Sequence, residues 1–202
     1  MKISKWISGA VAGVVAAVGL VSAHAQPAAP DALVKSLATE VTTVLKNDPA
    51  ILGNAAKLRD LIETRLIPNF NFQRMTQLAM GRSWGKASPE QQAALTKEFQ
   101  TLLVRTYSGA LANFRNNTID YRPLRMQAAD TDVTVKTVVN QANGQGIPID
   151  YSMEKAADGS WKAYDVVVAG VSLVTNYREE FNTVVRDQGV DALVKQLQSK
   201  NR

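Results

Sequence analysis

The sequence predicts an α+β fold: a curved, antiparallel, four-stranded sheet covered by helices that enclose an apolar cavity. The spacing of apolar residues predicts it. Up to about residue 115 they recur at helical intervals, and from residue 118 they alternate with a period of two, as in strands. Beyond residue 170 the helical spacing returns. Four consecutive strands thus stand between two groups of helices, and a sheet of this kind must bury one face against them.

The first 25 residues predict an export signal that is not part of the fold. Lys2 and Lys5 precede an apolar run, and the run ends in the cleavage pattern Ala23-His24-Ala25. A transmembrane anchor is the competing interpretation, but the run is rich in Ala and Gly and slightly short for a span. We expect a signal peptide over 1–25, a linker over 26–30 and a single domain over 31–202.

The composition excludes several kinds of active site. The chain has 202 residues, no cysteine and one histidine, His24, which lies in the predicted signal. The mature protein would therefore lack thiol chemistry, an imidazole base, and thiolate or imidazole metal ligands. The formal charge of +5 falls to +3 when Lys2 and Lys5 are removed. That charge is too small to predict nucleic acid as a partner.

Helices are predicted in four segments before the sheet. Asp31 can cap the first, whose apolar residues end at Leu45. The second lies between Pro49 and Pro68, and a short third one covers 70–81.

The clearest local pattern in the chain is Ser88-Pro89-Glu90-Gln91, which opens the fourth helix after a loop around Trp84. It combines an N-cap serine, a proline at the first helical position and a capping-box glutamine. The helix can run to about Arg115 and has one apolar face. An ordinary core is the default explanation of that face, and a ligand cavity is the alternative.

The four predicted strands cover roughly 118–124, 133–139, 147–153 and 161–168, and the short turns between them predict a meander. Turns are expected at 143–146 and 158–159. The third strand has the cleanest one-sided pattern in the chain. Its apolar residues are Ile147, Ile149, Tyr151 and Met153.

The fourth strand and the helix after it form a corner around Gly170. Both parities of the strand carry apolar residues, which predicts cover on both faces and leaves open which parity faces inward. Ser172 can cap the helix, which Gly189 ends before a last short helix. We interpret this corner as closing an apolar interior on which the function depends.

An enzyme in this interior is one alternative. Asp120, Asp150 or Asp165, with Tyr164 or Tyr177 as a donor, would suit an isomerase- or hydratase-like reaction. The favoured interpretation places Asp120 and Asp150 on solvent faces and lets Asp165 bond a helix end or an arginine. No Gly-rich loop has phosphate-binding spacing. We therefore expect a protein that is not an enzyme.

Segments spread over the chain resemble the MlaC/toluene-tolerance family of periplasmic phospholipid-binding proteins of Gram-negative bacteria. Near the C-terminus they are Trp161-Lys162-Ala163-Tyr164-Asp165-Val166, Gly170-Val171-Ser172-Leu173-Val174, Asn176-Tyr177-Arg178 and Phe181. Earlier ones are Met75-Thr76, Gly81-Arg82, Trp84, Ser88, Gln91, Phe99, Leu102-Leu103 and Tyr107. The resemblance runs in order from Asp31 to Leu197. Ala169 departs from it, because an acidic residue is expected before the glycine.

The resemblance implies a soluble periplasmic carrier of glycerophospholipid. Such a carrier would serve a lipid-asymmetry pathway, between an outer-membrane lipoprotein–porin complex and an inner-membrane ABC transporter. It implies no cofactor, with bound phospholipid as cargo, and no nucleic-acid partner. We expect a monomer that opens for release through the helix after Gly170 or the loop around Trp84.

The predicted lipid-binding residues are those expected to face the interior. They are Phe70, Met75, Leu78, Trp84, Phe99, Leu103, Tyr107, Val133, Val135, Ile149, Tyr151, Val166, Val168, Val171, Leu173, Tyr177 and Phe181. Val167 replaces Val166 and Val168 if the other strand parity faces inward. Cations that could line the mouth are Lys86, Arg105, Arg115, Arg122, Arg125 and Arg178. The rival hypotheses are the enzyme described above and an interaction protein with a filled core.

Overall fold

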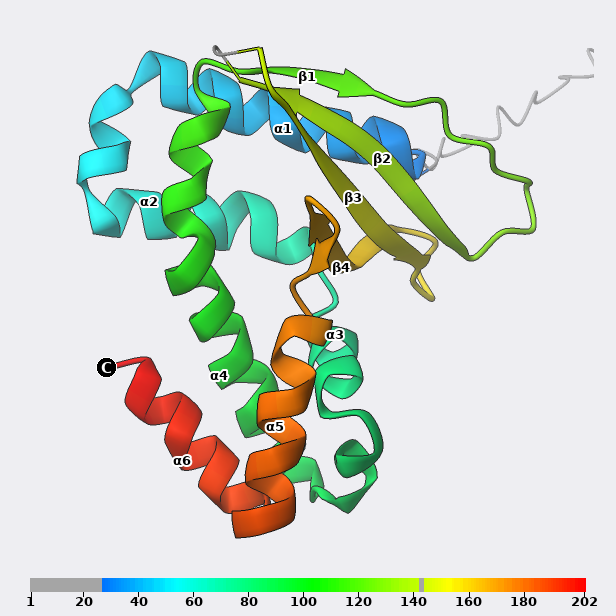
Figure 1. Cartoon of the computed structure of the whole chain (residues 1–202). Coiled ribbons are helices and arrows are strands. Elements are labelled where there is room, and N and C mark those ends of the chain that lie inside the picture. The colour runs from blue at the N-terminus through cyan, green and yellow to red at the C-terminus, as the bar shows by residue number, and fades with distance from the viewer. Residues whose placement is uncertain (1–26, 142–143) are drawn as a thin grey trace, which may run out of the picture.

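The computed structural model describes residues 27–141 and 144–202, so the predicted export signal and the turn residue Asn143 lie outside the described part. Within it, a meander of strands is followed and preceded by helices, as the sequence predicts (Figure 1). The α+β prediction is confirmed.

The sheet has the strand order β1-β2-β3-β4-β5, and every neighbouring pair is antiparallel. The strands are β1 (Thr118–Tyr121), β2 (Asp132–Asn140), β3 (Gly146–Lys155), β4 (Trp161–Val168) and β5 (Val171–Ser172). The two-residue β5 was not predicted, because so short a strand leaves no alternating pattern. The first strand also ends before Leu124, since the chain leaves the sheet after Tyr121.

A β-bulge in β4 decides which of its residues face inward. Tyr151 pairs with Val166, whereas Met153 pairs with Ala163, so Tyr164 has no partner in the register. The extra residue switches the parity of the strand. Ala163 and Val166 therefore lie on the same face. This explains why both parities are apolar: each supplies the inner face over half of the strand.

Tyr164, displaced by this bulge, lies on the other face. It packs against the helical core, and the guanidinium of Arg74 lies 3.9 Å from its ring centroid. Its hydroxyl donates to Asp132 Oδ1 at 2.8 Å. Arg74 also pairs with Asp132 and Glu154. The predicted cover on both faces of the strand is thus present at Tyr164, where Arg74 ties α3 to the sheet.

The described part has six α-helices. They are α1 (Pro30–Asn47), α2 (Ala55–Leu61), α3 (Phe72–Met80), α4 (Pro89–Tyr107), α5 (Thr175–Gln188) and α6 (Val190–Lys200). In Figure 1, α1 lies along the sheet, whereas α3, α5 and α6 gather around the far half of α4. The long α4 therefore connects a sheet half to a helical half.

Several predicted helices are interrupted by turns that are not α-helical. The second predicted helix divides into 3-10 turns at Pro49–Gly53, α2, a π-helical turn at Ile62–Leu66 and a 3-10 turn at Ile67–Asn69. The fourth continues beyond Tyr107 as 3-10 turns, Ser108–Phe114. The segment around Trp84, predicted as a loop, is the 3-10 helix Gly81–Lys86.

Of the three predicted N-caps, only that of α4 is found as predicted. The capping box of α4 is complete: the N–H of Gln91 donates to Ser88 Oγ at 3.2 Å, and the N–H of Ser88 donates to Gln91 Oε1 at 2.9 Å. Ser172 Oγ accepts from the N–H of Thr175 at 3.0 Å, but α5 has Val174 at its N-cap and no side-chain cap. Asp31 does not cap α1, which begins one residue earlier, at Pro30, with no side-chain cap.

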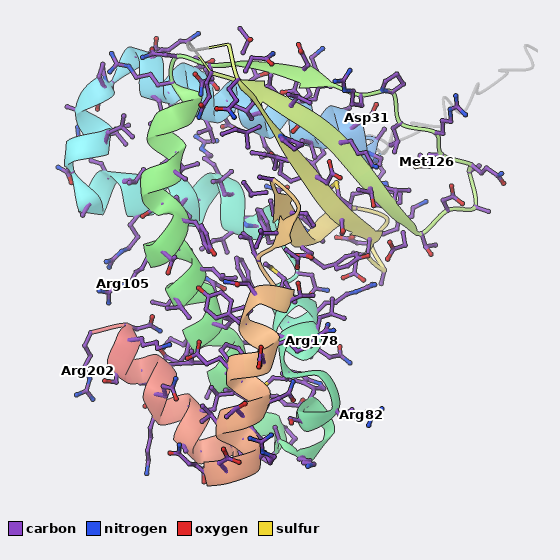
Figure 2. All side chains as sticks on the ribbon, viewed as in Figure 1. Asp31, Arg82, Arg105, Met126, Arg178 and Arg202 are labelled. Carbon is purple, nitrogen blue, oxygen red and sulfur yellow. The ribbon has the colours of Figure 1, made fainter. Side chains whose placement is uncertain are left out.

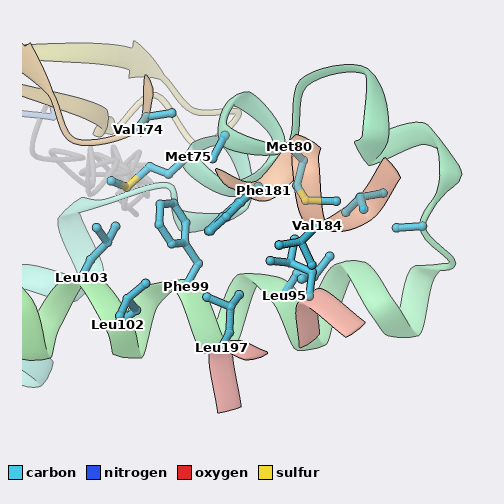
Figure 3. Packing of buried hydrophobic residues seen from close by; sticks show 14 residues of the cluster. Met75, Met80, Leu95, Phe99, Leu102, Leu103, Val174, Phe181, Val184 and Leu197 are labelled. Carbon is cyan, nitrogen blue, oxygen red and sulfur yellow. The ribbon is translucent and has the colours of Figure 1, made fainter. Parts of the chain in front are cut away.

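The helical half has a solid core (Figure 3). Phe99 of α4 and Phe181 of α5 are both fully buried, and their ring centroids lie 5.1 Å apart in an edge-to-face arrangement. Leu95, Leu193 and Leu197 are also fully buried. Packing of this density leaves little room for anything but the protein's own side chains.

Ala169 occupies a backbone conformation that alanine rarely adopts. Its φ of 49° and the 85° of Gly170 form a β4–β5 turn with two left-handed residues. That turn favours Asn or Asp followed by Gly. We expect Ala169→Asn to raise the free energy of unfolding by about 0.5–1 kcal/mol in urea titration. In contrast, Ala157→Asn, at a turn position whose own φ is not positive, should bring no gain; equal effects at both sites would contradict the argument.

Candidate binding cavity

A cavity of about 360 Å³ lies between the inner face of the sheet, α1 and the irregular turns around residues 66–70 and 110–117. We call it the large lobe. It is lined by Val34, Leu37, Ala38, Val41, Leu66, Asn69, Phe70, Tyr107, Ala110, Leu111, Asn117, Val139, Gln141, Ile147, Ile149, Tyr151, Met153, Ala163, Val166, Val168 and Leu173. The hollow that the fold prediction requires is therefore present.

A second cavity of about 140 Å³, the small lobe, extends toward the helical half. Its wall includes Phe72 and Met75 of α3 and Leu103 and Val104 of α4. The two lobes share the residues Leu66, Phe70, Tyr107, Leu111, Val166 and Leu173. Because they share this wall, we treat them as one branched cavity.

The alternation of the strands builds the floor of the large lobe. Ile147, Ile149, Tyr151 and Met153 of β3 all line it, which confirms the one-sided pattern of this strand. Val166 and Val168 lie opposite Tyr151 and Ile149 in the register. At the end near Met153, the side chains of Val34, Val133, Val135 and Trp161 close the space as a packed cluster.

The lining is almost entirely apolar. Apart from tyrosines and Ser108, its polar side chains are the amides Asn69, Asn117 and Gln141. No Asp, Glu, Lys or Arg of the described residues lines either lobe. Such a surface offers many non-directional contacts to an apolar ligand and no charged group for catalysis.

Two tyrosines of the cavity wall have raised pKa values. Tyr107 lines both lobes, and its hydroxyl lies near that of Tyr177. Burial raises the pKa of Tyr107. The hydroxyl of Tyr151 lies near Thr137, whose own hydroxyl donates to the carbonyl of Ile149 at 2.9 Å.

Tyr151 should make stability fall in strong alkali. Burial raises its pKa from 10.0 to about 12, so the folded protein favours the neutral phenol. That contribution is complete below pH 10 and is lost as the pH rises from 10 to about 12. Over this window we expect the wild type to lose about 2–3 kcal/mol more than Tyr151→Phe in urea titrations. Parallel curves for the two proteins would show that Tyr151 stays solvated.

Nine of the predicted lipid-binding residues line the cavity. They are Phe70, Met75, Leu103, Tyr107, Ile149, Tyr151, Val166, Val168 and Leu173. They come from five separate parts of the chain, and the fold brings them together. Val167 does not replace Val166 and Val168, because the bulge sets the parity. Contact of these residues with a lipid stays a prediction.

The other eight predicted residues line neither lobe. Leu78, Trp84, Phe99, Tyr177 and Phe181 belong to the helical core or pack against it. Val133 and Val135 lie on the correct face of the sheet, but Trp161 and Val34 fill the space above them. Val171 is 56% exposed at the tip of the β4–β5 turn. An apolar stripe does not by itself distinguish a packed core from a cavity wall.

The sequence interpretation missed the wall supplied by α1. Val34, Leu37, Ala38 and Val41 all line the large lobe. Their spacing of three, one and three residues is one helical face. None of the six cations considered for the mouth lines either lobe, which agrees with the default interpretation of each as a solvated surface side chain. Figure 2 shows Arg105 and Arg178 on the outer surface of their helices.

Two of the carboxylates proposed for the enzyme alternative accept hydrogen bonds within the fold. Asp165 accepts from the hydroxyl of Ser172 at 2.5 Å and from the N–H of Val174 at 3.2 Å, so it bonds the start of α5 as predicted. Asp120 is exposed and accepts from Asn140. Within residues 27–141 and 144–202, no cluster of acidic or histidine side chains could hold a metal. No helix in the same ranges is long and apolar enough to cross a membrane.

Comparisons with known proteins agree with this architecture. A solved structure of a phospholipid-binding protein from Ralstonia solanacearum, in complex with a phospholipid, has a TM-score of 0.79 and 42% identity. The match covers 86% of this chain and 97% of that one.

Two curated proteins are also similar. The intermembrane phospholipid transport system binding protein MlaC of Haemophilus influenzae is 26% identical, over 75% of this chain and 72% of that protein. The toluene tolerance protein ttg2D of Pseudomonas putida is 28% identical, over 52% of this chain and 48% of that protein. The model of the MlaC protein family matches residues 35–199. The resemblance seen in the sequence is confirmed, and the chain belongs to the MlaC family.

Proposed function

We propose that this protein is a periplasmic phospholipid carrier that holds acyl chains in the branched cavity. The observation that supports it is that the described lining residues, which come from the sheet, α1 and α4 among others, include no acidic or basic side chain. The Ralstonia solanacearum protein, which has the same fold at 42% identity, was solved with a phospholipid.

The physical need for such a cavity is clear from the energetics of lipid transfer. Each methylene group moved from water to an apolar site gains about 0.8 kcal/mol. Because exposing each methylene group to water costs the same amount, a lipid with two acyl tails cannot cross water unprotected. A carrier must replace the bilayer with many apolar contacts, and it needs no catalytic group and no cofactor. The cavity has this character.

The cavity in this structure is small for a complete diacyl lipid. An apolar cavity of about 150 Å³ holds benzene, so the two lobes together hold roughly twenty carbons. Full loading would therefore require the walls to widen. The π-helical turn Ile62–Leu66 and the 3-10 turns Ser108–Phe114 contribute to both lobes and are the parts best suited to move.

Transport between two membranes would require partners that open this cavity. We propose an outer-membrane lipoprotein–porin complex and an inner-membrane ABC transporter, with the monomer moving between them. A partner that binds a widened state would shift the population toward release. The absence of a membrane-spanning helix among the described residues is consistent with a shuttle.

Mass spectrometry of an organic extract from the purified protein tests the carrier function. The expected result is a phospholipid in near-stoichiometric amount. A small polar ligand would support the enzyme alternative instead, and an empty protein would support the interaction protein. Transfer of a fluorescent phospholipid between vesicles should rise with protein concentration; a flat response would contradict transport.

A further inference from the structure

The branching of the cavity has a consequence for the length of the acyl chain. The small lobe of about 140 Å³ is closed on the side of the helical half by Met75 and Leu103. Both also belong to the helical core, with exposures of 1% and 5%. Each side chain therefore lines the small lobe and also belongs to the helical core.

Behind these two side chains lies the closely packed helical core. Phe99 is fully buried and packs edge to face on Phe181 at 5.1 Å and on Tyr177 at 5.2 Å. Ala79 and Leu95 are fully buried in the same core. Close-packed interiors compress little, so this end of the small lobe is a firm stop. The irregular turns that border both lobes, Ile62–Leu66 and Ser108–Phe114, lie elsewhere in the wall.

A rigid end wall makes the affinity of the cavity depend on the length of the acyl tail. Each methylene that finds room in an apolar cavity improves affinity by roughly fourfold. A tail that is too long must expose its excess methylenes or displace the wall, and both lose that gain. By the benzene comparison the small lobe takes about six carbons, so a change of two or three carbons in its depth is a large fraction of its capacity.

We propose that the methyl end of one acyl tail enters the small lobe, and that Leu103 and Met75 set the maximum length of that tail. This inference rests on the proposed carrier function and specifies its substrate class as phospholipids of limited tail length.

Variants that change the depth of the small lobe test the inference. The protein is loaded from vesicles containing an equimolar series of saturated diacyl phosphatidylethanolamines that differ in tail length, and bound lipid is measured by mass spectrometry. Leu103→Ala should shift the preferred tail toward longer chains by about two or three carbons, the size of the group removed. Val104→Phe, which fills the lobe from the half-buried Val104, should shift it toward shorter chains.

Leu95→Ala is the matched control. Leu95 is a fully buried leucine of α4 in the same core as Leu103, but it lines neither lobe. The Leu95→Ala protein should be less stable than the wild type but should keep the same tail-length preference. Unchanged preference in both Leu103→Ala and Val104→Phe would overturn the inference, and so would an equal shift in Leu95→Ala. A wild type that takes up no lipid would instead overturn the carrier function itself.

Discussion

Ile149→Arg should remove nearly all bound phospholipid from the purified protein. Ile149 is 8% exposed and lies on the floor of the large lobe. No acidic side chain of the described lining could pair with a guanidinium there. An unpaired charge among acyl chains costs several kcal/mol, and about 3 kcal/mol already reduces affinity more than a hundredfold. The measurement is the amount of phospholipid per protein after gentle purification.

Two controls separate loss of the cavity from loss of the fold. Thr134→Arg places the same side chain at an exposed position of β2 and should keep the lipid. Ile149→Met preserves the apolar lining and should also retain the bound lipid. Circular dichroism should show a folded Ile149→Arg protein, because the guanidinium can extend into the cavity toward its amides. If folded Ile149→Arg retained wild-type lipid, the large lobe would not be the binding site.

Phe99→Ala should lower the free energy of unfolding by about 3–5 kcal/mol, the largest stability effect expected here. Phe99 is fully buried at the centre of the helical core, between Phe181 and Tyr177. The hole left by the ring could not be refilled by the tightly packed neighbours. Denaturant titration with the bound lipid removed measures the loss.

Phe70→Ala is the informative comparison. Phe70 is half-buried, lines both lobes and stacks on Phe72 with 5.7 Å between ring centroids. Its loss should cost less stability than that of Phe99 but should reduce bound lipid more. Both phenylalanines were predicted as lining residues, and the structure separates them. Should Phe99→Ala lose lipid while keeping its stability, the helical core would be part of the cavity.

The sequence was sufficient for the elements whose patterns are local. The capping box at Ser88 and the alternation of Ile147, Ile149, Tyr151 and Met153 depend only on neighbouring residues, and both are found as predicted. The order of β2, β3 and β4 also follows from the short turns between them, whereas a longer connection, 122–131, joins β1 to β2. These features predicted the α+β fold and the floor of the cavity.

Features that depend on distant parts of the chain could not be read from the pattern. The bulge at Tyr164 appears only in the register between β3 and β4. Val135 and Ile149 lie on the same face of the sheet. Trp161 of β4 packs in one cluster with Val135, whereas Ile149 lines the cavity. Whether an apolar residue meets protein or empty space depends on what the remaining elements leave unfilled.

The central claim is that acyl chains lie inside the branched cavity. A crystal structure of the protein loaded with a phospholipid that carries bromine on its acyl tails tests it most directly, because the anomalous signal locates each bromine. The account predicts bromine peaks enclosed by Phe70, Ile149, Val166 and Leu173. Peaks confined to the outer surface, with the cavity volume unchanged, would contradict it.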